Sequence, residues 1–153
     1  MKKLLIGLLI LFLIAQFFRP SKNLAANGEE HYQELATRYN IDADTQDLLV
    51  RSCYDCHSAH TQYPWYAEIT PINYYLADHV EEGKEHFDFA EFDSYDLKKL
   101  NHKLEEMVEE IEEDKMPLSE YTNIHRKAIV SEEEKAILID WANNYRAQLT
   151  NNE

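Results

Sequence analysis

The pentapeptide Cys53-Tyr54-Asp55-Cys56-His57 constrains this 153-residue chain more than any other feature, because it uses both cysteines of the protein. Two thiols at positions i and i+3 can form thioethers to the two vinyl groups of one haem, and the histidine that follows can bind the iron from one face. This order of residues is typical of c-type haem attachment. We therefore predict that Cys53 and Cys56 attach haem c covalently and that His57 is the proximal iron ligand.

Three other interpretations of the cysteine pair stay open. A thioredoxin-like redox motif lies between a strand and a helix, but no strand pattern precedes Cys53. A zinc site commonly needs a second Cys or His pair at short spacing, and the sequence has none. A structural disulfide is compatible with an exported protein, where thiols oxidise. A non-haem redox or disulfide module is therefore kept as an alternative.

The N-terminus has the pattern of an export signal. Lys2 and Lys3 precede an apolar run from Leu4 to Phe18, which Arg19 and Pro20 close. A helix of this length spans about 22 Å, against about 30 Å of hydrocarbon, so a crossing requires the flanking basic side chains to snorkel. We predict a signal-anchor or transmembrane segment at 1–19, a tether at 20–30 and a haem-binding domain at 31–153, on the periplasmic or exterior side. A soluble periplasmic domain released by cleavage is the alternative.

Charge is distributed unevenly along the chain. All 29 acidic residues lie after residue 28 and four of the 15 basic residues lie before it, so the exported part has 11 basic residues and a formal charge of −18. Nucleic acid is excluded as a partner, because phosphate binding requires positive charge. The acidic surface favours a basic redox partner, and solubility of a small exported domain is the alternative explanation. We expect a monomeric domain.

The apolar spacing is helical and no convincing strand alternation is present. The clearest helix spans 96–114, where apolar side chains recur at i, i+3 and i+4 and glutamates fill the other face as a solvated surface. The last helix opens with a capping box between Ser131 and Glu134. We predict an all-α, monohaem cytochrome c-like domain. Further helices are expected at 31–38, from an N-cap at Asp42 or Asp44 to Cys53, and at 72–87, where Gly83 weakens the second half.

The second axial ligand decides whether the iron is closed to small molecules. Met116 is the first candidate, because it follows the acidic helix and because Pro117 stiffens the loop that carries it. A methionine that fills the core is the alternative. The rival ligands are His79, His86 and His125, and for each of these a surface or hydrogen-bonded histidine is the ordinary state.

An aromatic loop punctuated by prolines follows the haem motif. Within it, Trp65 and Tyr66 are expected to pack against the haem edge or to bond a propionate. Ordinary aromatic core is an equal interpretation of both residues. The loop therefore contributes candidate cofactor-binding residues but no candidate catalytic residue.

Together these segments resemble the small bacterial haem-binding-domain family, c-type cytochrome relatives that often begin with a membrane segment. The resemblance covers nearly the whole chain and implies a covalently bound haem and a monohaem cytochrome c-like helical fold, but no substrate. One departure is Arg126, where similar members tend to have proline. The matching pieces are Gln16–Pro20, Cys53–Ser58, Tyr63–Tyr66, Asp78–His86, Met116–Leu118, Tyr121, Ile124-His125 and Leu138–Trp141.

We accordingly predict a membrane-tethered monohaem cytochrome that transfers single electrons to or from a redox partner protein, rather than an enzyme. The alternative is a haem sensor or peroxidase-like enzyme with an open distal site. The seven histidines of the chain would make acid–base chemistry available to such an enzyme.

Overall fold

The computed structural model describes residues 1–25 and 27–150, and within these ranges every regular element is helical. The prediction of an all-α protein is therefore confirmed. Leu24 and His60 form an isolated antiparallel β-bridge, which lies outside any strand. The α-helices are α1 (Lys2–Ala15), α2 (Gly28–Arg38), α3 (Ala43–Ser52), α4 (Tyr54–His57), α5 (Ile72–His86), α6 (Leu97–Glu112), α7 (Ser119–Ile124) and α8 (Glu132–Thr150). Three 3₁₀ turns complete the set: η1 (Trp65–Glu68), η2 (Phe89–Ser94) and η3 (Arg126–Ala128).

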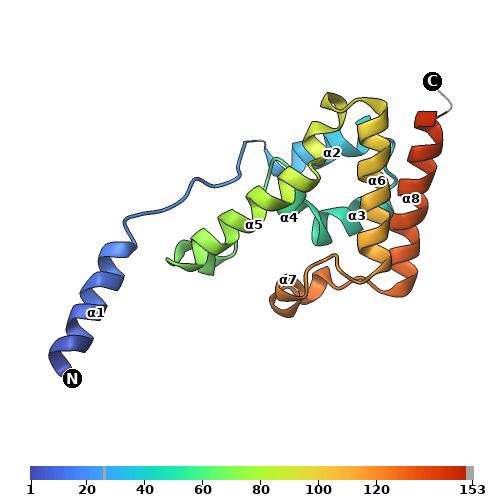
Figure 1. The fold of residues 1–153 in the computed structure, drawn as a ribbon. Helices are drawn as coiled ribbons and strands as arrows, with labels where there is room; N and C mark the ends of the chain where they lie inside the picture. The colour runs from blue at the N-terminus through green and yellow to red at the C-terminus, as the bar shows by residue number, and fades with distance from the viewer. Residues whose placement is uncertain (26, 151–153) are drawn as a thin grey trace.

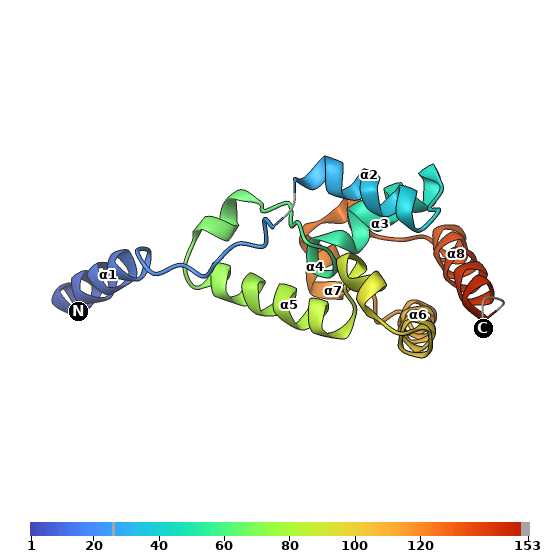
Figure 2. The same cartoon turned by 90° about the horizontal axis from the view of Figure 1, so that it is seen from above.

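The two longest helices, α6 and α8, lie side by side and form one wall of the domain (Figures 1 and 2). Both begin with a side-chain cap, and the sequence predicted the one at Ser131. The Asp96 carboxylate accepts a hydrogen bond from the Lys99 amide at 2.7 Å. Ser131 and Glu134 form the reciprocal capping box, with amide-to-side-chain distances of 2.8 and 3.3 Å.

The aromatic side chains of a segment that joins α5 to α6 fill much of the core. Phe87, Phe89 and Phe92 are buried, and their ring centroids lie 4.7 to 5.1 Å apart. Burying one such side chain contributes about 1.5–3 kcal/mol. The η2 turn that carries two of them is capped by Asp88, whose carboxylate accepts from the Ala90 amide at 2.9 Å. The sequence analysis did not predict this turn.

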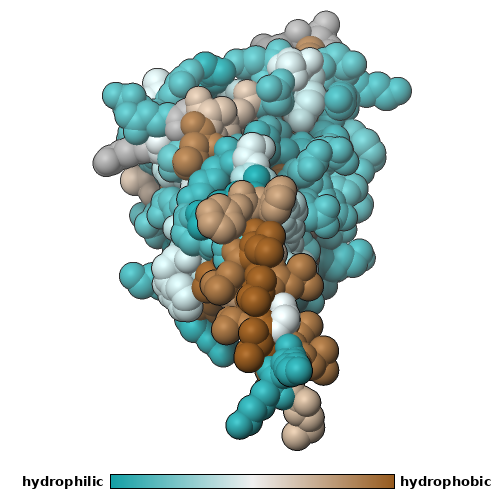
Figure 3. All heavy atoms as spheres, turned by 90° about the vertical axis from the view of Figure 1, so that its left-hand side faces the viewer, coloured by the Kyte–Doolittle hydropathy of each residue, from teal (hydrophilic) through white to brown (hydrophobic). Residues whose placement is uncertain are grey.

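The helix α1 is apolar and exposed along its length, and Figure 3 shows it as a hydrophobic column against a largely hydrophilic domain. Across residues 1–25 and 27–150, no helix combines the length and apolar character that a membrane crossing needs. Hydrogen bonds and ion pairs of the residues that follow α1 connect its C-terminal end to the domain. The Gln16 amide donates to the Thr70 carbonyl at 3.2 Å and accepts from the Thr70 amide at 2.9 Å, and Arg19 and Lys22 both pair with Glu68.

Within the predicted tether, residues in the ranges 20–25 and 27–30 form contacts with the domain. The Asn23 side-chain amide donates to the Ser58 carbonyl and to the Thr61 hydroxyl, each at 2.9 Å, and α2 already begins at Gly28. The polar composition that suggested a tether therefore reflects hydrogen bonds to the segment after the haem motif. This pairing holds the N-terminal segment against α4.

Candidate functional site

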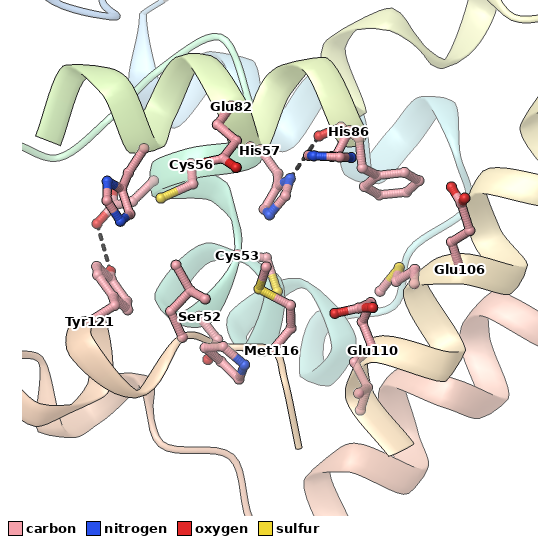
Figure 4. Close-up of a pocket in the computed structure, with 18 of the residues that line it drawn as sticks. Ser52, Cys53, Cys56, His57, Glu82, His86, Glu106, Glu110, Met116 and Tyr121 are labelled. Carbon is pink, nitrogen blue, oxygen red and sulfur yellow. Dashed lines mark hydrogen bonds between the residues drawn. The ribbon is translucent and has the colours of Figure 1, made fainter. Parts of the chain in front are cut away.

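The haem motif forms a single helical turn, α4, which continues from α3 through a bend at Cys53. The amides of Cys56 and His57 both donate to the Cys53 carbonyl, at 3.2 and 3.0 Å. Residues three apart lie on one face of a helical turn. Both thiols and the His57 imidazole consequently line the same cavity, as Figure 4 shows. Both cysteines are free thiols.

The two residues between the cysteines hold this turn in place from its other sides. Tyr54 is fully buried, and its ring centroid lies 5.0 Å from that of Phe89 in the core. The Asp55 carboxylate accepts from the Gln62 amide at 2.8 Å and from the Tyr121 hydroxyl at 2.7 Å. The variable positions of the motif thus anchor it to the core and to α7. The sequence analysis assigned no role to Asp55 or Tyr121.

His57 is held in the form that a metal ligand requires. Its Nδ1 lies 2.7 Å from the Phe87 carbonyl oxygen, which can only accept, so we assign the ring proton to Nδ1. This bond leaves the Nε2 lone pair free, the arrangement in which metal-binding histidines are oriented by a carbonyl. Burial lowers the pKa of His57, and the Phe87 carbonyl offsets only part of that effect. The imidazole is therefore neutral at pH 7.

Helix α5 crosses the haem motif at Gly83. A Cβ atom at this position would lie 3.0 Å from the Cys56 carbonyl oxygen and 3.1 Å from the Cys56 Cβ. The sequence predicted a helix at 72–87 with a weak point at this glycine. The structure supplies the reason for the weak point, because only glycine allows α5 to approach α4 this closely.

The cavity has a volume of about 730 Å³, within the range of small-molecule and cofactor sites. The helices α4 and α5 form one side of it, and α6 with the loop to α7 forms the other (Figure 4). Ser52 lines it with a buried hydroxyl that has no hydrogen-bond partner among residues 1–25 and 27–150. The apolar part of the lining consists of Phe87, Phe89, Met107, Ile111, Leu118, Val130 and Leu138.

Met116 reaches the cavity because α6 ends in a Schellman motif. Asp114 adopts a positive φ of 58°, the Lys115 amide donates to the Glu110 carbonyl at 2.9 Å, and the Asp114 amide donates to the Ile111 carbonyl at 3.3 Å. The chain therefore turns back, and the half-buried Met116 lies across the cavity opening from His57 in Figure 4. Met107 of α6 packs against the core and also lines the cavity.

The structure brings two of the three rival histidines to the cavity. His79 and His86 both line it from α5, and the His79 Nδ1 lies 2.9 Å from the Tyr75 carbonyl oxygen. His125 instead lines a second, more open hollow. Trp65 and Tyr66 also line the hollow and not the cavity, and Trp65 is 78% exposed, so it is not part of the core.

Acidic side chains surround the cavity, which the sequence analysis did not anticipate. It interpreted the glutamates of α6 as a solvated face, because their spacing does not show which neighbour they approach. Among the described residues, Lys103 is the single lysine or arginine in the cavity lining. Its ammonium group pairs with the Glu106 carboxylate at 3.4 Å. The acidic lining residues are Asp55, Glu82, Glu106, Glu109, Glu110 and Glu120.

Comparisons with known proteins give one match. A family model described as a haem-binding domain matches residues 10–144, most of the chain. Neither the search of curated proteins nor the search of solved structures found a match. The matched range includes the motif, α5, the Met116 loop and all residues that line the cavity.

Proposed function

The chain belongs to the haem-binding domain family and binds haem, and we propose that it does so as an exported c-type cytochrome that transfers single electrons. The observation that carries this proposal is the donor set of one cavity: two thiols three residues apart, a neutral imidazole with a free Nε2, and a thioether. These residues fit a haem. When bound, the group supplies a one-electron redox couple.

The placement of the two thiols supports covalent attachment over the non-haem alternatives. Burial raises the pKa of Cys53 to about 12 and the pKa of Cys56 to about 11. Both thiols line the cavity beside the His57 imidazole, where a haem would meet all three side chains. Among residues 1–25 and 27–150, no group of three or more His, Cys, Asp or Glu side chains is arranged to hold a metal ion.

The loop that carries Met116 supports electron transfer over small-molecule chemistry. A protein ligand on each face closes the iron and favours electron transfer, whereas an open face favours binding of small molecules. Met116 lines the cavity across from His57 and is held by a bond from its amide to the Glu110 carbonyl at 3.0 Å. His57 and Met116 are therefore the proposed axial pair, and His79 and His86 remain the alternatives to Met116.

The ligand pair is tested by comparing Met116→Ala with Met107→Ala in the purified holoprotein. Both variants remove a thioether from the cavity lining, but only Met116 is proposed to bind the iron. We expect Met116→Ala to lose the methionine–iron band, to lower the reduction potential and to bind carbon monoxide rapidly when reduced, and Met107→Ala to retain the band. A reduced wild-type protein that binds carbon monoxide rapidly would instead support the sensor or peroxidase-like alternative.

The proposal places the domain on the exported side, tethered by the N-terminal segment. Its support is the charge pattern of that segment, with Lys2 and Lys3 before the apolar run, and the exposure of the apolar side chains of α1. A phosphatase fused to the C-terminus of the full chain should be active only if the domain is exported. An inactive but intact fusion would contradict the exported location.

A further inference from the structure

A second hollow lies directly behind the wall of the cavity. It has a volume of about 600 Å³ and is lined by residues of η1, α7 and η3. Asp55 and Tyr121 line both spaces, and the hydrogen bond between them is 2.7 Å long. One pair of side chains therefore separates the haem cavity from the hollow.

Aromatic rings continue from this wall to the protein surface. The Tyr121 ring stacks on the His125 ring, with centroids 4.2 Å apart and planes 26° apart. The His125 Nε2 is hydrogen bonded to the Tyr66 hydroxyl. The Tyr66 ring centroid lies 5.9 Å from that of Trp65, which is exposed. The four rings form a continuous series of contacts from the cavity wall to the outside.

The hollow is also basic in a domain that is otherwise strongly acidic. Arg51, Arg126 and Lys127 line it, against the single carboxylate of Asp55 within the described lining. The Arg51 guanidinium is already bonded within the domain, because it donates to the Ile129 carbonyl at 3.0 Å and pairs with Glu134. Four basic side chains of the domain form no ion pair within residues 1–25 and 27–150, namely Lys98, Lys99, Arg126 and Lys127.

We propose that this hollow is the docking surface for a redox partner protein that presents an acidic face. The inference rests on the proposed electron-transfer function. Exposed Trp65 and Ile124 provide apolar contact area, and tryptophan and arginine are enriched among the residues that dominate protein interfaces. The two unpaired cations attract carboxylates. The net charge of the chain favoured a basic partner, but the local charge of the hollow favours an acidic one.

With haem held in the cavity, the group would supply a one-electron couple: the reduced partner would lose one electron, this protein would gain it, and no bond would form or break. Docking at the hollow would leave only the Asp55–Tyr121 wall between the partner and the cavity. Because electron transfer slows steeply with distance, a surface that adjoins the cavity is a favourable place for a partner to bind. The ring contacts explain why the wall is held in one position.

The test uses plant-type ferredoxin, an acidic and strongly reducing one-electron protein, as the probe. The rate at which reduced ferredoxin reduces the ferric full-length holoprotein is compared between wild type, a variant with Arg126→Glu and Lys127→Glu, and a matched control with Lys98→Glu and Lys99→Glu. Both variants change the net charge by the same amount. Lys98 and Lys99 lie at the start of α6, at the opposite end of the domain from α7 (Figure 1).

We expect reversal at the hollow to lower the second-order rate at low salt by about tenfold or more, and the control to lower it by less than about twofold. A second measurement detects binding independently of electron transfer. In NMR titrations of the holoprotein, oxidised ferredoxin should shift the indole N–H signal of Trp65 and leave that of Trp141, which is buried, in place. The haem spectrum of each variant confirms that it is folded.

Equal slowing of both variants, or no slowing of either, would overturn the docking surface. So would an unchanged rate in the Arg126 and Lys127 variant combined with a loss of binding to anionic phospholipid vesicles, which would assign the hollow to a membrane surface. Failure of the proposed function looks different. In that case the purified protein would lack haem, or would not be reduced even by dithionite.

Discussion

The cavity and the hollow share a wall but differ in almost every other property. The cavity is lined by apolar side chains, both thiols, His57 and six carboxylates, whereas the hollow is lined by three basic side chains and aromatic rings. One four-residue turn, α4, serves both. Cys56 and His57 of α4 face the cavity together with its N-cap residue Cys53, and Asp55 belongs to the wall. The difference teaches that the cysteines and the histidine of the motif provide the proposed cofactor chemistry, whereas Asp55, between the two cysteines, connects the motif to the hollow.

The largest expected effect comes from removing the imidazole on the cavity side. His57→Ala should still form thioethers but should lose the proximal ligand, so the absorption spectrum and reduction potential of the holoprotein should change completely. His102→Ala is the matched control, because His102 is exposed on α6 and does not line the cavity. An unchanged spectrum in His57→Ala, or equal changes in both variants, would contradict the assignment of His57.

The next effect concerns the close contact that forms the cavity. Gly83→Ala should lower the free energy of unfolding by about 1–3 kcal/mol, because the added methyl group meets the Cys56 backbone. Helix propensity alone predicts the opposite sign, a gain of about 1 kcal/mol. Urea unfolding of the holoprotein measures the change, with Glu81→Ala on the exposed face of the same helix as control. Stabilisation by Gly83→Ala would show that the contact between α5 and Cys56 has room for a methyl group.

The wall itself is tested by a double-mutant cycle. A hydrogen bond to a charged acceptor contributes about 1.5–3 kcal/mol when buried, and the lower end applies to the half-buried pair of Asp55 and Tyr121. Asp55→Asn and Tyr121→Phe should therefore each destabilise the protein, and the double variant should lose less than the sum. Additive losses in the free energy of unfolding would mean that the two side chains do not interact.

The smallest expected effect compares the influence of a charge in the cavity lining with that of a charge at the hollow. Glu110→Gln removes a negative charge from the cavity lining and should raise the reduction potential by about 20–40 mV, the equivalent of about 0.5–1 kcal/mol for one electron. Arg126→Gln, at the hollow, should change the potential less and the ferredoxin rate more. Protein-film voltammetry measures both potentials. A larger shift from Arg126→Gln would contradict the division between the two regions.

Features that depend on neighbouring residues were predictable from the sequence. The N-caps at Asp42 and Ser131 formed as expected, because a cap requires only a side-chain oxygen and amides two or three residues away. The helical spacing of the apolar residues was sufficient to identify the all-α class. The motif identified the proposed haem-binding residues, and the structure gathers Cys53, Cys56, His57 and Met116 around one cavity.

Features that depend on distant contacts were not predictable. Tyr121 meets Asp55 across 66 residues of chain, and His57 bonds a backbone carbonyl 30 residues away, for which no side-chain pattern exists. The sequence analysis assigned Trp65 and Tyr66 either to the haem edge or to the aromatic core, and the structure places both in the lining of the hollow. The bonds from Asn23, within the predicted tether, were not predictable because their partners, Ser58 and Thr61, lie 35 and 38 residues away.

Covalent attachment of haem at the motif is tested most directly by mass spectrometry of the tryptic peptide Ser52–Lys84, prepared under denaturing conditions from cells that mature c-type cytochromes. This peptide contains both cysteines and is unaffected by any cleavage of the N-terminus. We predict a mass equal to the peptide plus one haem, and loss of that addition when Cys53 and Cys56 are both changed to alanine. The mass of the bare peptide, obtained from cells in which a known c-type cytochrome is fully matured, would contradict covalent attachment.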